Sequence, residues 1–312
     1  MLKHNGLDGV KAQPLQTSSL HTGGAKAPSR QKDNIGVLRL ILASLVIVGH
    51  APEMVDGSRV REPMTVVFGT LSLGEVAVDA FFLISGYLIT SSWSHTRSMA
   101  RYLKKRLLRI YPAFVLSYCL CVALAYFLGG DPSQGLPNAV VRLVLLHSPP
   151  NYPGMLTGVH YATLNGSMWT IAYEFRCYLL VAVLGMTGLL ARPRVVSGFV
   201  VAGLLAMVLA TFEAVQQALD SAGHFHGIAY ALGSPLDTVR LTTAFLLGSC
   251  AYLHREMVSL YVNRSRAWVC ACAAALLLFH DLHFGEVSLL LFGGVFLFWI
   301  AFQADLGPVQ VI

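Results

Sequence analysis

Charged residues are scarce in this chain of 312 residues. Only 12% are Asp, Glu, Lys or Arg, whereas 55% are hydrophobic and the mean hydropathy is +0.61. A soluble globular domain usually has about a quarter of its residues charged. Apolar runs long enough to cross a bilayer recur from about residue 35 to the end. The sequence therefore argues against a large water-soluble core and predicts a polytopic membrane protein.

Other features that the sequence lacks narrow the function. Its six cysteines show no paired spacing typical of a zinc site or a disulfide framework, so we interpret them as packing residues and expect no metal. No glycine-rich phosphate loop is present, which argues against a nucleoside triphosphate site. No internal repeat of fixed period is present, which argues against a solenoid or an inverted-repeat transporter. We expect no nucleic-acid partner.

The apolar runs predict an all-α fold, a polytopic integral membrane helical bundle of about eight transmembrane helices. Their approximate centres are at Ala43, Leu83, Val122, Leu180, Leu204, Leu246, Ala274 and Gly293. Lys and Arg cluster in the N-terminal tail, at residues 97–109, and after the fourth and sixth helices. The positive-inside rule then predicts that both termini lie in the cytosol. The long outer loop is expected at about residues 130–165, with a short interfacial helix at Val140 to His147.

The first 34 residues differ in composition from the rest. They are rich in Gly, Ser, Lys and Gln, and they lack the apolar region of a secretory signal. We predict a disordered cytosolic tail at residues 1–34, followed by a transmembrane domain at residues 35–304.

The first apolar run, "LRLILASLVIVGH" at residues 38–50, contains two ionisable residues. Eleven residues at about 100° each give three turns and about 20°, so Arg39 and His50 share one helix face, about 16 Å apart along the axis. In the predicted topology Arg39 lies near the cytosolic surface and His50 in the outer half of the membrane. The alternative is that Arg39 is an anchor whose charge reaches the interface and His50 an interfacial histidine.

Two carboxylates lie inside later apolar runs. Asp79 belongs to "GEVAVDAFFLISGYLIT", where a charge costs a few kcal/mol unless it is paired or hydrated. Ser85 and Gly86 in the same run favour close helix packing. Glu174 belongs to a polar stripe in "NGSMWTIAYEFRCYLL", which indicates a residue that faces the bundle interior. A structural Glu–Arg pair to a neighbouring helix is the alternative for Glu174.

A pair of arginines begins the third predicted helix, in "RSMARYLKKRLLRIYP". Arg106 and Arg109 are three residues apart, so their side chains project together at the membrane edge. Paired arginines suit phosphate because they form forked, charge-assisted hydrogen bonds. The alternative is a topology signal whose only partner is anionic lipid. Together with Arg39, these residues predict that an anionic ligand binds at the cytosolic edge of the helix bundle and that the reaction takes place deeper in the membrane.

Five segments, spread over about residues 35–255, resemble acyltransferase family 3, whose members are membrane proteins that acylate carbohydrates and other acceptors. Arg39 and His50, with ten residues between them, resemble the first-helix motif of that family. The strings "VDAFFLISGYLIT", "KKRLLRIYP", "NGSMWTIAYEF" and "AFLLGSCAY" resemble its later motifs in the same order. Members usually continue through about ten helices, so we expect two C-terminal helices to be absent from this chain.

The resemblance implies transfer of an acyl group, acetyl in the typical case, from cytosolic acyl-coenzyme A to a sugar hydroxyl of an envelope molecule. It implies that His50 is the general base or a transient acyl carrier, and that Arg39, Arg106 and Arg109 hold the anionic donor. Asp79 or Glu174 would orient the imidazole or bind sugar hydroxyls. A neutral imidazole is the usual proton acceptor for a hydroxyl near neutral pH.

Two other functions remain open from the sequence. A transporter or flippase for an anionic envelope precursor could use the same cationic mouth and intramembrane carboxylates. An inactive, truncated family member could only bind lipid or partners. In all three cases we expect a multi-pass protein of the cell (inner or plasma) membrane.

Overall fold

The computed structural model describes residues 34–304. The description leaves out residues 70, 97, 153, 156–157, 159–162, 213–214, 216–232 and 281–283. The predicted tail, except Asn34, therefore lies outside the described residues. Within the described part of the chain every regular element is helical, which confirms the all-α class. The elements in chain order are α1 (Ile35–Asp56), α2 (Pro63–Phe68), α3 (Leu73–Thr96), α4 (Met99–Phe127), η1 (Pro132–Gly135), α5 (Leu136–Leu145), η2 (Gly166–Met168), α6 (Trp169–Met186), η3 (Leu189–Ala191), α7 (Pro193–Leu209), α10 (Pro235–Leu253), α11 (Arg255–Tyr261), α12 (Arg264–His280), α13 (Gly285–Ser288), η4 (Leu289–Gly293) and α14 (Gly294–Phe302).

The predicted number of spans is not supported. Among the described residues, five helices are long and apolar enough to cross a membrane: α1, α3, α4, η2 with α6, and the continuous run Gly285–Phe302. A sixth would be formed by α11 and α12 together, but these two helices are bent by 89° at their junction. Helix α7 has only 17 residues, and α10 carries Asp237 and Arg240 within 19 residues. Apolar composition predicted the helices but overestimated how many of them meet the length and hydropathy of a span.

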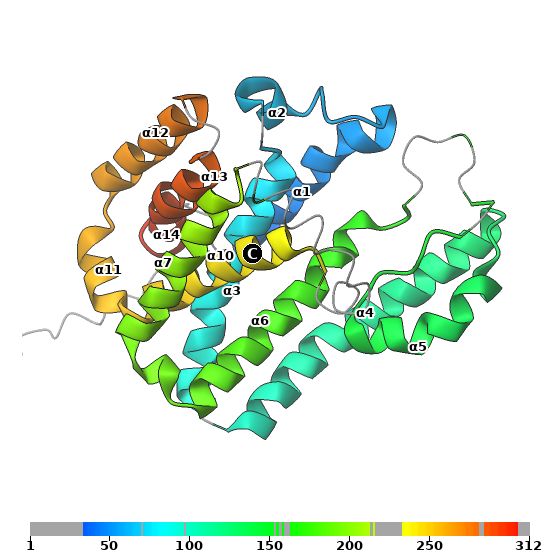
Figure 1. Ribbon diagram of the computed structural model, residues 1–312, viewed down its shortest axis with the longest axis horizontal. Helices are drawn as coiled ribbons and strands as arrows, with labels where there is room; N and C mark the ends of the chain where they lie inside the picture. Colours follow the sequence, from blue (N-terminus) through cyan, green and yellow to red (C-terminus); the bar gives the residue numbers. More distant parts are fainter. Residues whose placement is uncertain are drawn as a thin grey trace, which may run out of the picture. The chain divides into compact units, whose positions relative to one another are not determined.

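Helix α3 is central because α1, α6 and α10 all pack against it (Figure 1). Its contact with α10 depends on two glycines. A Cβ on Gly86 would lie 1.8 Å from the carbonyl oxygen of Phe245, and a Cβ on Gly248 would lie 1.9 Å from that of Leu83. Glycine at both positions lets the two backbones approach, as small residues do in membrane helix pairs. The packing role predicted for Gly86 is confirmed, and the "AFLLGSCAY" string supplies its partner.

Helix α1 runs antiparallel to α3. A Cβ on Gly49 would lie 2.6 Å from the backbone nitrogen of Gly74, so the helices approach closely at that level. Arg39 is ten residues before Gly49 on α1, and Ile84 is ten residues after Gly74 on α3. Because the helices are antiparallel, Arg39 and Ile84 lie at the same level, about 15 Å along the helix axes from the Gly49–Gly74 contact. The other end of α1 is fixed by Asn34, whose Nδ2 donates to the carbonyl oxygen of Ile300 at 2.7 Å.

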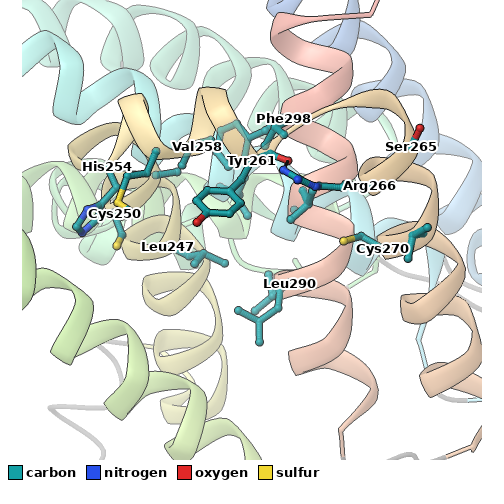
Figure 2. A pocket seen from close by; sticks show the side chains of 18 residues that line it. Leu247, Cys250, His254, Val258, Tyr261, Ser265, Arg266, Cys270, Leu290 and Phe298 are labelled. Atoms are coloured by element: carbon teal, nitrogen blue, oxygen red, sulfur yellow. Dashed lines mark hydrogen bonds between the residues drawn. The ribbon is translucent and has the colours of Figure 1, made fainter.

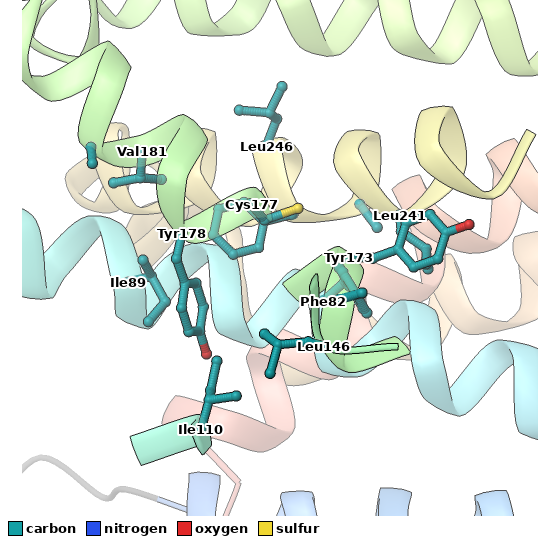
Figure 3. Close-up of a cluster of buried hydrophobic side chains, with 14 of the residues drawn as sticks. Phe82, Ile89, Ile110, Leu146, Tyr173, Cys177, Tyr178, Val181, Leu241 and Leu246 are labelled. Atoms are coloured by element: carbon teal, nitrogen blue, oxygen red, sulfur yellow. The ribbon is translucent and has the colours of Figure 1, made fainter. Parts of the chain in front are cut away.

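The main core lies where α3, α4, α6 and α10 meet (Figure 3). Phe82 and Ile89 of α3, Ile110 of α4, Tyr178 of α6 and Leu241 of α10 are all buried there. A hydrogen bond of 2.9 Å from the Tyr102 hydroxyl to the carbonyl oxygen of Tyr178 joins α4 to α6 within this core. Cys121 and Cys177 are buried in it, in agreement with the packing role predicted for the cysteines, whereas Cys119 and Cys272 are exposed.

A short helix occupies part of the predicted outer loop. It was expected at Val140 to His147 and is observed as α5, Leu136–Leu145. The Tyr111 hydroxyl donates to the carbonyl oxygen of Val144 at 2.8 Å, so this helix is attached to α4. Of the second predicted outer loop, residues 216–232 lie outside the described residues.

Candidate functional site

His50 lies near the C-terminal end of α1, beside a carboxylate on the same helix. Its Nδ1 is 3.4 Å from Oε2 of Glu53, three residues further on. The imidazole side chain is 29% exposed and that of Glu53 is 22% exposed, so the pair is partly shielded and still reachable. A Cβ on Gly74 would lie 3.7 Å from Nε2 of His50, so glycine at this position leaves room beside that nitrogen.

An ion-pair network continues from Glu53 to α3. Arg59 Nε donates to Glu53 Oε2 and Arg59 Nη1 donates to Glu75 Oε1, both at 3.1 Å. Glu75 also accepts hydrogen bonds of 2.9 Å from the backbone nitrogen and the hydroxyl of Ser72. The carboxylate next to His50 is therefore held from two sides, by its own helix and by the loop that follows it. We define His50, Glu53, Arg59 and Glu75 as the histidine group.

The loop between α1 and α3 is organised by a buried carboxylate. Glu62 is fully buried and accepts from the backbone nitrogens of Thr65 and Leu73 at 2.7 and 2.8 Å. Burial alone would raise the pKa of Glu62, but these backbone hydrogen bonds outweigh it and lower the pKa below its usual value. The charged carboxylate thus caps α2 and joins it to the start of α3.

Glu174 lies in a second group, near the middle of the bundle. It accepts a hydrogen bond from the Ser85 hydroxyl at 3.3 Å and another from the Tyr178 hydroxyl, one turn further along α6. The guanidinium of Arg106 lies 5.8 Å from the centroids of both the Tyr102 and the Tyr178 rings. Its Nη2 donates to Ser92 at 3.2 Å, while its buried Nε has no hydrogen-bond partner in the described structure.

Asp79 lies one helical turn from Glu75 on α3, and its partner is a cation from another helix. Its Oδ1 is 3.4 Å from Nε of Arg240 on α10, and the two side chains are only 4% and 10% exposed. Neither atom has a hydrogen bond of good geometry in the described structure, so the contact is an ion pair alone. Arg240 also approaches Asp237, at 3.9 Å. A carboxylate that would be costly alone in the membrane is thus paired with a cation from a neighbouring helix.

The six predicted site residues are therefore separated into distinct places. Glu174 and Arg106 are linked through Tyr178, whereas the carboxylate beside His50 is Glu53. Neither Asp79 nor Glu174 has a hydrogen bond or ion pair with the imidazole in the described structure, whose carboxylate neighbour is Glu53. Arg109, in contrast to Arg106, is exposed.

The sequence did not lead us to four residues that take part in the contacts of these groups: Glu53, Arg59, Glu75 and Arg240. Glu53 could have been found, because a residue three positions from His50 shares its helix face. Arg59, Glu75 and Arg240 could not, because their positions depend on the loop and on helix packing. Within the described part of the chain, no three His, Cys, Asp or Glu residues lie close enough together to hold a metal ion.

A comparison with protein families decides the relationship that these motifs suggested. The family described as an acyltransferase domain matches residues 32–310, nearly the whole chain. The chain belongs to acyltransferase family 3. No solved structure gives a significant match.

Three curated relatives of this acyltransferase family 3 chain are known. It is 32% identical over 154 residues to an O-acetyl transferase of Shigella phage Sf6, a match to 46% of this chain and 43% of the relative. It is 29% identical over 168 residues to nodulation protein 10 of Rhizobium leguminosarum bv. viciae, covering 50% and 45%. It is 27% identical over 121 residues to acyltransferase MdmB of Streptomyces mycarofaciens, covering 37% and 29%. The matches span less than half the length of each of these relatives.

Proposed function

We propose that this chain transfers an acyl group, most simply acetyl, from cytosolic acyl-coenzyme A to a hydroxyl of an envelope carbohydrate or polysaccharide precursor. Membership of acyltransferase family 3 and the likeness to a phage O-acetyl transferase support the reaction type. The donor and the acceptor are part of the proposal. The observation that carries it is the partly exposed His50 with Glu53 at its Nδ1.

The histidine group suits a general base. If Nδ1 of His50 carries the ring proton and donates a hydrogen bond to Glu53, Nε2 is unprotonated and can accept the proton of a hydroxyl. The acceptor oxygen then attacks the thioester carbonyl as Nε2 takes its proton. The carbon–sulfur bond breaks, and the proton on His50 passes to the departing thiolate, so that the products are an ester and free coenzyme A.

The arginines suit the anionic donor. Arg106 has a buried Nε without a hydrogen-bond partner in the described structure, which a phosphate oxygen would satisfy. The Tyr178 ring lies beside its guanidinium, and the hydrogen bond from Tyr178 to Glu174 would hold that ring in position. Arg109, one turn further along α4 and exposed, would meet a second phosphate, and Arg39 on α1 would also help to hold the anionic end of the donor.

The proposed location is the cell membrane, with several spans, both termini in the cytosol, and the carbohydrate acceptor reached from outside. The five apolar helices support a membrane protein. Cysteines introduced at Ser98 and Ser133 should be labelled from opposite sides of the membrane. Labelling of both from the same side would contradict this orientation.

The reaction is tested by incubating membranes that contain the full chain with acetyl-coenzyme A labelled in the acetyl group, together with envelope polysaccharide. We expect label to appear in alkali-labile ester linkage on the polysaccharide. Movement of an intact precursor across the membrane without ester formation would favour the transporter alternative. Donor binding with neither result would favour an inactive family member.

A further inference from the structure

A cavity of about 750 Å³ lies away from all the groups described above, between α10, α11, α12 and the helical run Gly285–Phe302 (Figure 2). Leu83, Leu247, Leu290 and Phe298 are among the apolar residues that line it, and none of the residues of the histidine group, Glu174, Arg106, Asp79 or Arg240 does. Its size falls within the range of about 300–1,000 Å³ that is common for ligand pockets.

The few polar residues of the lining include three that α11 and the start of α12 supply. Tyr261, Ser265 and Arg266 line the cavity where these two helices meet at the 89° bend (Figure 2). The rest of the lining is mostly apolar and includes Leu247, Leu290 and Phe298. The cavity is thus an apolar space with one guanidinium, that of Arg266, at its wall, which suits an amphiphile with an anionic headgroup.

Arg266 is held in place and still has donors to offer. Its Nη1 donates to the carbonyl oxygen of Tyr261 at 3.0 Å, and its guanidinium lies 5.5 Å from the centroid of the Tyr261 ring. Within the described part of the chain, its Nε and Nη2 make no hydrogen bond. A positioned guanidinium with two open donor atoms suits a phosphate better than it suits a neutral headgroup.

We infer that this cavity binds an anionic phospholipid, with the phosphate at Arg266 and one acyl chain along Leu247, Leu290 and Phe298. Charge complementarity selects this occupant, because basic pockets between membrane helices commonly bind anionic lipid headgroups. This inference does not depend on the proposed acyl transfer.

The test uses the purified full chain in mild detergent. It is titrated with dioleoyl phosphatidylglycerol or dioleoyl phosphatidylcholine, and bound lipids are counted by native mass spectrometry. We expect tighter binding of phosphatidylglycerol. Arg266→Gln should weaken phosphatidylglycerol binding by about fivefold, the effect of one cation at a membrane surface, and leave phosphatidylcholine unchanged. Val295→Trp, which fills the cavity, should weaken binding of phosphatidylglycerol to a similar or greater degree.

Arg264→Gln is the matched control, because Arg264 is exposed, begins the same helix and does not line the cavity. Equal losses from Arg264→Gln and Arg266→Gln would show a general surface charge effect and overturn the inference. A loss from Val295→Trp with none from Arg266→Gln would show an apolar occupant, such as a neutral chain or a helix of a partner, and would also overturn it. Thermal melting of each variant verifies that it remains folded.

Discussion

Glu53 lies one helical turn from His50 on α1, with 3.4 Å between Glu53 Oε2 and His50 Nδ1, and the same oxygen lies 3.1 Å from Nε of Arg59. A carboxylate in this place fixes the orientation and the tautomer of an imidazole and stabilises the imidazolium that forms when the base takes a proton. The proposed reaction therefore depends on Glu53 as a positioning residue that does not itself touch the substrate.

Replacement of Glu53 should separate this role from a structural one. Glu53→Gln keeps the side-chain size but removes the charge, and we expect kcat to fall by about tenfold or more while the KM for acetyl-coenzyme A stays unchanged. Steady-state kinetics of the purified variants measure both values. Arg59→Gln is the control, because it removes the link from Glu53 to the loop and leaves the Glu53 carboxylate beside His50. If Arg59→Gln lowers kcat as much as Glu53→Gln does, Glu53 acts by holding the loop.

The arginines of α4 should affect the donor rather than the base. Arg106→Lys and Arg109→Lys keep the charge but lose the forked geometry, so we expect the Kd for acetyl-coenzyme A to rise by about 10-fold in each. Isothermal titration of the purified variants measures this. Arg101→Lys, at an exposed position in the same cationic stretch, should leave the Kd unchanged. Normal donor affinity in all three variants would mean that the stretch is only a topology signal.

The loop between α1 and α3 should lose its structure in acid. The pKa of Glu62 is lower in the folded protein than in the unfolded chain, so its stabilising effect is complete above the unfolded value and is lost as pH falls through the folded value. Hydrogen exchange at residues 62–69 should therefore accelerate as pH is lowered below about 4.5, after correction for the intrinsic pH dependence of exchange. Glu62→Gln should show fast exchange at neutral pH already. An unchanged loop in this variant would contradict the role of the charged carboxylate.

Close packing of α3 on α10 should tolerate no side chain at Gly248. A Cβ there would lie 1.9 Å from the carbonyl oxygen of Leu83, a backbone atom that cannot move alone. We expect Gly248→Leu to lower the stability by about 3 kcal/mol or more, which thermal melting in detergent would detect. Gly198→Leu is the matched control, because a Cβ at Gly198 has no neighbour within 4 Å. Equal melting temperatures for the two variants would contradict the proposed helix contact.

The sequence predicted the helices better than it predicted the site. Every predicted span centre falls within a helix, because apolar length alone determines where a membrane helix forms. The number of spans was overestimated, because α7 is short, α10 carries two charges, and the linear pattern does not show the 89° bend between α11 and α12. Gly86 was correctly predicted to pack closely, since a glycine in an apolar helix has few other uses.

Whether the partner of an ionisable residue could be predicted depended on how far apart the two residues lie in the sequence. The contact between Glu53 and His50 follows from helical spacing and was available from the sequence. The pairing of Asp79 with Arg240 requires the packing of α3 on α10, and the link from Glu53 to Glu75 requires the fold of the loop that contains Arg59. Long-range contacts of this kind are set by tertiary structure, which explains why Asp79 and Glu174 were expected beside His50 and are not there.

The central claim is that His50 takes the proton of the acceptor hydroxyl, and one measurement tests it most directly. The initial rate of ester formation from labelled acetyl-coenzyme A is compared for the unmodified chain, His50→Ala and His95→Ala, with donor binding measured in parallel. His95 is an exposed histidine at the end of α3, away from the histidine group. We expect His50→Ala to lose about 10²- to 10⁴-fold in rate with donor affinity intact, and His95→Ala to react normally. A His50→Ala protein that is inserted, binds donor and forms ester at the normal rate would contradict the account.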